Sequence, residues 1–221
     1  MLIEEAKWIQ NVLRNNFSIE NYPLLNIGSS TAVFREKTQA HIHESVFKPL
    51  KEKSLRVIHT DIKEDAGVDA VGDLNDPLFR DSLKKMGIKS VLCSNLLEHL
   101  EHPKEICDAI MDLLQPNDLI IVTVPHYFPF HKDPIDTMLR PSIAELHNFF
   151  PGTKIVEAQI VDANDCYKNA LLSNPKYFLI MALRLFLPFY KYKEWRLIVK
   201  DFFNINRKYS ACCLLLCKQA T

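Results

Sequence analysis

The segment from residue 122 to 146 gathers the side chains best suited to moving a proton, namely His126, His131, Asp133 and Asp136. A neutral histidine held by a carboxylate accepts a proton from a hydroxyl near neutral pH, so this pairing suits general-base chemistry. We expect His131 to be the base, with Asp133 or Asp136 orienting its ring, and His126 to be the second choice. The alternative is a rigid loop whose charged groups satisfy one another.

Two further chemistries are open to the same loop. Arg140 carries a planar fork that binds an anionic substrate group through two parallel hydrogen bonds. Tyr127, Phe128 and Phe130 lie between the polar residues and can shield a reacting centre from water. The histidines and aspartates of the loop are also metal-ligand types, but their spacing matches none of the strong zinc signatures. We therefore expect no metal.

Polar residues also stand directly after other expected strands. They are the turn Gly28-Ser29-Ser30 after "PLLNI", Asp61 after "RVIHT", and Ser94 and Asn95 at the end of "SVLCSN", with Glu98 and His99 just beyond. The carboxyl ends of parallel strands meet at one edge of a sheet, so these residues should border a common ligand site. The single glycine of the first turn argues against a dinucleotide, whose pyrophosphate needs close backbone approach at several points.

The elements that must position these residues alternate along the chain. Residues 2–16 show helical spacing of apolar side chains, and Ser142 with Glu145 forms a capping box that opens a later helix. Further helices are expected near 40–52, 78–86 and 103–114, and strands at 23–27, 56–60, 90–95, 119–125, 154–162 and 209–217. The runs at 90–95 and 119–125 are apolar throughout, which is typical of strands buried on both faces of a parallel sheet. The pattern predicts a doubly wound α/β sheet.

Composition limits the class of protein. A chain of 221 residues suits one large domain, so we expect 1–221 to form a single unit. The formal net charge is zero, which gives no general attraction to nucleic acid. The six cysteines lack CxxC pairing and are expected to be reduced thiols in the cytoplasm. The acidic start "MLIEEAKW" does not resemble a signal peptide, and no apolar run is long enough to span a bilayer.

The segment 163–208 differs from the rest of the chain. Between 168 and 208 it holds nine Lys or Arg against Glu194 and Asp201, a net charge of +7, so the remaining chain carries −7. We expect a helical insertion before the final strand. Its basic and aromatic stretch at 176–200 can rest on an anionic membrane surface or cover a lipid-linked substrate. It can equally be an ordinary subdomain on the sheet edge or a homodimer interface.

Taken together, the strand-end residues, "SNLLEHLEHP" and "HKDPIDTMLRPS" resemble the class I S-adenosylmethionine-dependent methyltransferases. The chain looks especially like the small type 11-like members found among surface-polysaccharide and glycan biosynthesis enzymes. The resemblance covers about residues 20–162 and the final strand. It implies a Rossmann-like sheet, mostly parallel with an antiparallel last strand, and S-adenosylmethionine as cofactor. It also implies O-methylation of a small-molecule, saccharide or lipid-linked glycan acceptor, in the cytoplasm or at the inner face of the membrane.

The resemblance also assigns roles at the cofactor site. Asp61 would accept both ribose hydroxyls, Asp73 would reach the adenine amino group, and Leu74 would pack on the ring. Ser94 and Asn95 would lie beside the methionine portion. In the first turn, Asn26, Ser30 and Ala32 stand where most family members have an acidic residue and two glycines. Ser29 and Ser30 would still offer N–H groups and hydroxyls to the methionine carboxylate.

Two other readings stay open. The missing glycines permit a degenerate member that keeps the fold and serves as a binding or scaffolding protein. A nucleotide-sugar oxidoreductase is the third reading, but the chain lacks GxGxxG and any Tyr-x-x-x-Lys pair after the fourth strand.

Overall fold

The structure is a computed structural model that describes residues 1–131 and 135–220. Its centre is a seven-stranded sheet with the order β3-β2-β1-β4-β5-β7-β6. The strands are β1 (Leu24–Ile27), β2 (Val57–Asp61), β3 (Ala70–Val71), β4 (Ser90–Ser94), β5 (Leu119–Tyr127), β6 (Thr153–Cys166) and β7 (Lys208–Lys218). Neighbours are parallel from β3 to β5, whereas β7 runs antiparallel to both β5 and β6. The predicted sheet, with its antiparallel last strand, is confirmed.

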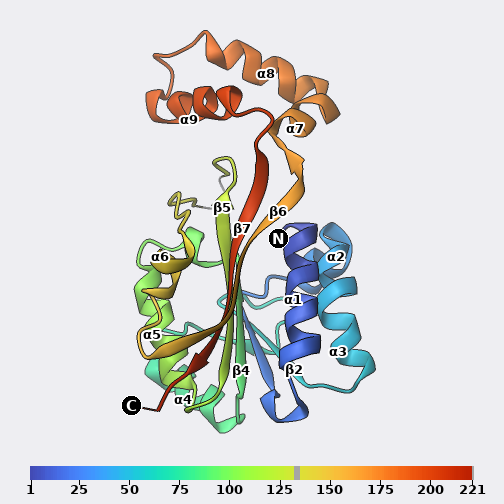
Figure 1. Cartoon of the computed structure of the whole chain (residues 1–221), viewed down its shortest axis with the longest axis vertical. Helices are drawn as coiled ribbons and strands as arrows, with labels where there is room; N and C mark the ends of the chain where they lie inside the picture. The colour runs from blue at the N-terminus through green and yellow to red at the C-terminus, as the bar shows by residue number, and fades with distance from the viewer. Residues whose placement is uncertain (132–134, 221) are drawn as a thin grey trace.

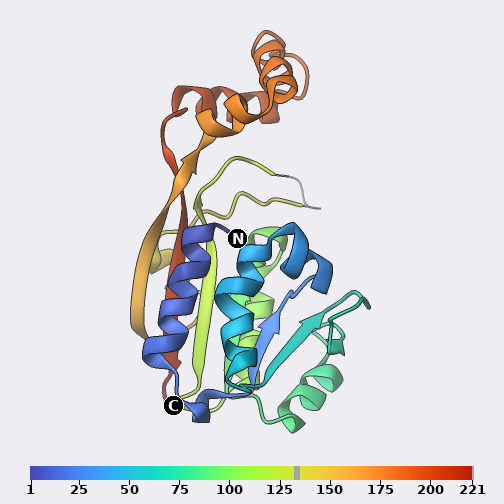
Figure 2. The same ribbon diagram turned by 90° about the vertical axis from the view of Figure 1, so that its right-hand side faces the viewer.

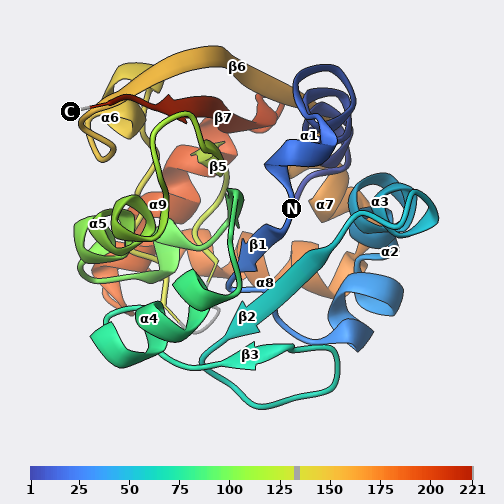
Figure 3. The ribbon, with the colours of Figure 1, turned by 90° about the horizontal axis from the view of Figure 1, so that it is seen from below.

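Helices cover both faces of this sheet (Figures 1 and 3). One face carries α1 (Ile3–Asn16), α2 (Ala40–Ile42) and α3 (Lys48–Glu52), and the other carries α4 (Pro77–Lys85), α5 (Pro103–Leu113) and α6 (Ile143–His147). Successive strand residues point to opposite faces, so Leu24 packs with the α1 cluster and Leu25 with the α5 cluster. Both side chains are fully buried, which explains the unbroken apolar runs of these strands.

The helix expected near 40–52 is interrupted. Two π-helical turns, Phe34–Thr38 and His43–Phe47, flank α2, and α3 follows the second of them. The two-residue strand β3 was not predicted, because it pairs with β2 through only Thr60–Ala70 and Asp61–Val71. The capping box at Ser142 and Glu145 is present and opens α6.

A long two-stranded ribbon leaves the sheet. β6 and β7 extend beyond the carboxyl end of β5 and carry α7 (Tyr167–Ser173), α8 (Pro175–Leu185) and α9 (Tyr192–Phe203) away from the body (Figures 1 and 2). The expected insertion at 163–208 is thus helical only in its middle, because both strands run into its ends. In the described part of the chain, no helix is long and apolar enough to cross a membrane.

Candidate functional site

A cavity of about 930 Å³ opens at the carboxyl ends of β1, β2 and β4. Every residue that the sequence assigned to cofactor binding borders it. These residues are Asn26, Gly28, Ser29, Ser30, Asp61, Asp73, Leu74, Ser94 and Asn95. The topology explains the gathering, since β1 pairs in parallel with both β2 and β4 and their ends lie at one edge.

The turn after β1 is held by an unexpected cation. Arg35 is almost fully buried, and its guanidinium donates to the carbonyl oxygens of Ser29 (2.8 Å), Ser30 (2.7 Å) and Gly67 (2.7 Å). Gly28 has a φ of +64° and Ser30 a φ of +53°, so the turn needs left-handed backbone at two positions. Arg35 thus holds together a turn in which Gly28 is the one glycine.

The first turn offers less to a ligand than expected. The Ser29 amide donates to the Thr60 carbonyl at 3.0 Å, and the Ser30 amide donates to Asp61 Oδ2 at 2.8 Å. The Ser29 hydroxyl donates to the carbonyl of Ser30 at 3.1 Å. These groups already have partners within the protein, so they are not the free donors for a carboxylate that the sequence suggested.

The two strand-end aspartates keep acceptor capacity. Asp61 receives one backbone N–H on each oxygen, from Ser30 and from Lys63 at 3.1 Å, and each carboxylate oxygen can accept another hydrogen bond. Asp73 is exposed, borders the cavity and accepts the amide of Asn75 on Oδ1 at 2.9 Å, so its Oδ2 keeps the capacity to accept a hydrogen bond. Leu74 beside it is buried.

A buried carboxylate from α1 organises the exit of β4. Glu5 is fully buried, borders the cavity, and accepts hydrogen bonds from Asn95 Nδ2 (2.6 Å), Thr123 Oγ1 (2.6 Å) and Ser94 Oγ (3.2 Å). Its second oxygen accepts the Leu2 amide at 3.0 Å. Glu5 was not predicted from the sequence. An acidic residue on the apolar face of an amphipathic helix is the pattern that could have indicated it.

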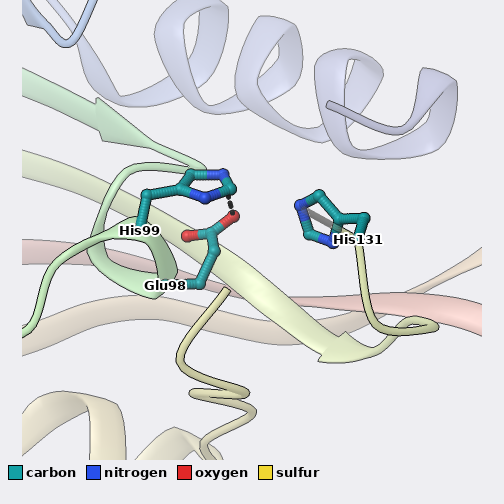
Figure 4. Close-up of side chains that lie close together, drawn as sticks. All are labelled: Glu98, His99 and His131. Carbon is teal, nitrogen blue, oxygen red and sulfur yellow. Dashed lines mark ion pairs between the residues drawn. The ribbon is translucent and has the colours of Figure 1, made fainter. Parts of the chain in front are cut away.

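Three ionisable side chains that border the cavity lie close together (Figure 4). Glu98 and His99 come from the short 3-10 turn after β4, and His131 comes from the loop after β5. One potential ligand atom from each lies within 4.8 Å of the others. Burial raises the pKa of Glu98 to about 8, and neither of its oxygens has a hydrogen-bond partner among the described residues.

The loop after β5 is braced internally. Asp136 is buried and receives both arms of the Arg140 fork, at 3.1 and 2.7 Å, as well as the amides of His131 and Met138. His131 Nδ1 lies 3.2 Å from Asp136 Oδ2. Burial of Asp136 opposes ionisation, but these donors outweigh it, so its pKa lies below the usual value. Asp136 thus stands where the sequence placed an orienting carboxylate.

The remaining predicted residues of this loop are placed differently. The guanidinium of Arg140 donates hydrogen bonds to Asp136 and to the carbonyl of Leu139. In this arrangement it is therefore not free to bind an anion. His126 is not among the residues bordering the cavity, and its Nδ1 lies 2.9 Å from the carbonyl of Pro141. Asp133 lies outside the described residues. Of the two candidate bases, only His131 borders the cavity, and burial lowers its pKa.

No protein-family model matches the chain, and no curated protein matches it in sequence. Solved structures do match in fold. Coclaurine N-methyltransferase bound to N-methylheliamine and SAH is 14% identical with a TM-score of 0.54, over 97% of this chain and 70% of that one. A SAM dependent methyltransferase from Archaeoglobus fulgidus is 16% identical with a TM-score of 0.52, over 96% and 94%.

The cyclase SpnF has the same fold, at 11% identity and a TM-score of 0.53, over 98% of this chain and 82% of that one. The chain therefore has the Rossmann-like fold of class I methyltransferases. At these identities the likeness defines the architecture, while the chemistry has to be argued from the site.

Proposed function

We propose that the protein is an S-adenosylmethionine-dependent methyltransferase. The observation that carries the proposal is the single cavity in which all nine expected cofactor residues meet, at the ligand-binding edge of this fold. Two of its methyltransferase neighbours are described as SAM dependent or bound to SAH. S-adenosylmethionine has no phosphates, so a turn with one glycine and few free amides suits it better than it suits a dinucleotide.

In the proposed complex, the cofactor lies across the strand ends. Asp61 accepts the ribose hydroxyls through the lone pairs not used by Ser30 and Lys63. Asp73 and Leu74 flank the adenine. The methionine portion lies beside Ser94 and Asn95, whose side chains the buried Glu5 holds in place.

The acceptor that we propose is a hydroxyl of a saccharide or lipid-linked glycan. Methyl transfer to oxygen needs the acceptor aligned with the sulfonium methyl group and its proton removed. The polar cluster of Glu98, His99 and His131 borders the cavity and can manage that proton. Phe128 packs edge-on against His131, with ring centroids 5.3 Å apart, and adds an apolar wall. The saccharide itself is inferred from the family resemblance.

We further propose that the α8–α9 hairpin contacts an anionic membrane surface. Neither helix has a buried residue, and Phe186, Phe189 and Phe203 are 82%, 99% and 86% exposed. The same hairpin supplies most of the basic charge of the 168–208 segment. It projects beyond the sheet edge at which the cavity opens, since β5 and β6 run in the same direction (Figure 1). This placement suits an enzyme whose acceptor is anchored in lipid.

Calorimetric titration with S-adenosylhomocysteine tests the cofactor, with NAD as the competing ligand. We expect micromolar binding of S-adenosylhomocysteine, none of NAD, and a loss of at least about tenfold in affinity in Asp61→Ala, which removes a charge-assisted pair of acceptors. Asp81→Ala is the matched control, because that side chain is 62% exposed on α4. A folded protein that binds neither ligand would support the degenerate, scaffolding reading instead.

A further inference from the structure

We propose that Glu98, His99 and His131 form a binding site for one divalent transition-metal ion of the zinc type. The site goes beyond the proposed function, because the three side chains define it whether or not a cofactor is bound. Its role toward an acceptor hydroxyl does rest on that function. Only His131 is shared with the ligand set considered from the sequence, since the other two ligands come from a different loop.

Glu98 is the first reason for the proposal. Its side chain is 1% exposed, and both carboxylate oxygens are buried without a hydrogen-bond partner in the described part of the chain. A buried carboxyl group without partners is costly, and native proteins rarely keep one without a use. The ring of His99 lies beside it, with Nε2 3.8 Å from Oε1 (Figure 4). A cation between them would satisfy both groups.

The two imidazoles are oriented as metal ligands are. His99 Nδ1 lies 2.5 Å from the carbonyl oxygen of Ile135, and His131 Nδ1 lies 3.4 Å from the carbonyl oxygen of Pro129 and 3.2 Å from Asp136 Oδ2. Acceptors at these distances hold the proton on Nδ1 and leave Nε2 unprotonated, which is the tautomer that binds a metal. The rings are perpendicular, with centroids 5.2 Å apart, and Figure 4 shows a ring nitrogen of His131 directed toward the other two residues.

Hydrogen bonds around the three residues join the two loops that carry them. The Arg140 fork fixes Asp136, which in turn orients His131. The amide and hydroxyl of Thr137 both donate to the Glu98 carbonyl, at 2.9 and 3.0 Å, and so tie the loop after β5 to the turn that carries Glu98 and His99. Arg140 places a positive charge nearby, but Asp136 pairs with it.

The donor set selects the kind of metal. Two imidazoles and one carboxylate suit zinc or iron(II), whereas magnesium prefers oxygen ligands alone. Ligand atoms around tetrahedral zinc stand about 3.4 Å apart, so the present separation of up to 4.8 Å requires small side-chain shifts. All three residues border the cavity, which leaves a coordination position facing an acceptor. A metal there would lower the pKa of a bound hydroxyl.

The test uses the full-length chain, stripped with EDTA and titrated with Zn²⁺, and separately with Co²⁺ while its visible absorption is followed. We expect one Zn²⁺ per chain and a Co²⁺ spectrum of a nitrogen- and oxygen-ligated site. His99→Asn, His131→Asn and Glu98→Gln should each weaken binding by roughly tenfold or more. His126→Asn is the matched control, since His126 lies near the end of β5, just before the loop of His131, and does not border the cavity.

Two results would overturn the site. One is the lack of any Zn²⁺ binding by the folded chain, which would leave His131 as a metal-free base. The other is binding that survives both His99→Asn and His131→Asn, which would assign the metal to exposed groups elsewhere. Titration of the same samples with S-adenosylhomocysteine separates this outcome from failure of the proposed function, because cofactor binding does not need these ligands. Near-ultraviolet circular dichroism verifies that each variant is folded.

Discussion

At the scale of single residues, Glu5 links parts of the chain that are far apart in sequence. Its carboxylate joins α1 to the end of β4 and to Thr123 in β5. The Glu5 carboxylate is fully buried and accepts hydrogen bonds from four donors. A glutamine at this position would turn its NH₂ group, itself a donor, toward at least one of these donors.

Glu5→Gln should therefore lower the free energy of unfolding by about 1–3 kcal/mol, the usual penalty for unmatched buried polar groups. Urea denaturation measures the change. Glu4→Gln is the control on the same helix, because the contact of Glu4 with Asn164 is exposed. Equal effects of the two substitutions would show that the buried network contributes nothing special.

His59 gives the molecule a pH dependence. Its ring packs edge-on against Phe47, and Asn26 Nδ2 lies 3.0 Å from its Nδ1. The pKa of His59 is lowered from 6.5 to about 4; burial is the main cause, Arg35 and His43 act in the same direction, and Asp69 opposes them. The unfolded chain takes up a proton below pH 6.5 that the folded chain refuses, so stability present at neutral pH is lost as the pH falls.

We expect the free energy of unfolding to fall by up to about 3 kcal/mol between pH 6.5 and 4 through this residue. In His59→Gln this part of the slope should disappear. Denaturant unfolding at several pH values provides the measurement, and His102→Gln, at an exposed position, is the control. An unchanged slope in His59→Gln would exclude His59 as its source.

The residues that could be predicted are those whose place follows from strand order. Asp61 and Asn95 border the cavity because Asp61 ends β2 and Asn95 directly follows β4. Glu5 and Arg35 could not be placed in the same way. Each lies on a helix, and its partners are fixed by how that helix packs on the sheet. The pairing of His131 with His99 likewise depends on how two loops fold together.

At the scale of elements, the π-helical turn Phe34–Thr38 carries Arg35, which stabilises the turn after β1. Arg35 reaches three carbonyl oxygens from this turn. Burial lowers the pKa of its guanidinium, although Asp69, Glu36 and Asp61 counteract this. The sequence predicted a helix only near 40–52 and did not predict this turn, because π-helical turns are rare and short.

Arg35→Gln should loosen the turn after β1, because at least one of the three carbonyls bound by Arg35, of which that of Ser29 is buried, loses its donor. We expect the affinity for S-adenosylhomocysteine to fall by about tenfold and unfolding stability by about 1–3 kcal/mol. Lys37→Gln, at an exposed position of the same turn, should change neither quantity. Calorimetry and urea denaturation report the two effects, and wild-type affinity in Arg35→Gln would remove Arg35 from the support of the site.

At the scale of the whole molecule, the α8–α9 hairpin contacts the body through a small area, where Tyr177 and Met181 of α8 pack on the base of the ribbon. The hairpin has no buried residue, while a small cluster around Tyr127, Tyr167 and Tyr209 closes the base of the ribbon. The apolar side chains that the hairpin exposes are therefore expected to bind a partner surface.

Replacing residues 174–206 by a short glycine-serine linker should keep S-adenosylhomocysteine binding and abolish sedimentation with anionic phosphatidylglycerol vesicles. Neutral phosphatidylcholine vesicles are the lipid control, and Phe186→Ser with Phe189→Ser is the milder variant. Analytical ultracentrifugation covers the alternative of a homodimer interface. If the intact protein is dimeric, if both variants are monomeric, and if vesicles never bind it, the hairpin is a protein interface.

The position of β7 affects how the chain folds during its synthesis. β7 lies between β5 and β6 in the sheet, but it is synthesised only after the whole hairpin. Until residue 208 emerges, the apolar edges of β5 and β6 have no strand to pair with, and such open edges readily join other chains. Translational pauses or chaperones acting between residues 166 and 208 would therefore govern the yield of folded protein. An early stop in that interval should give aggregates instead of a smaller folded protein.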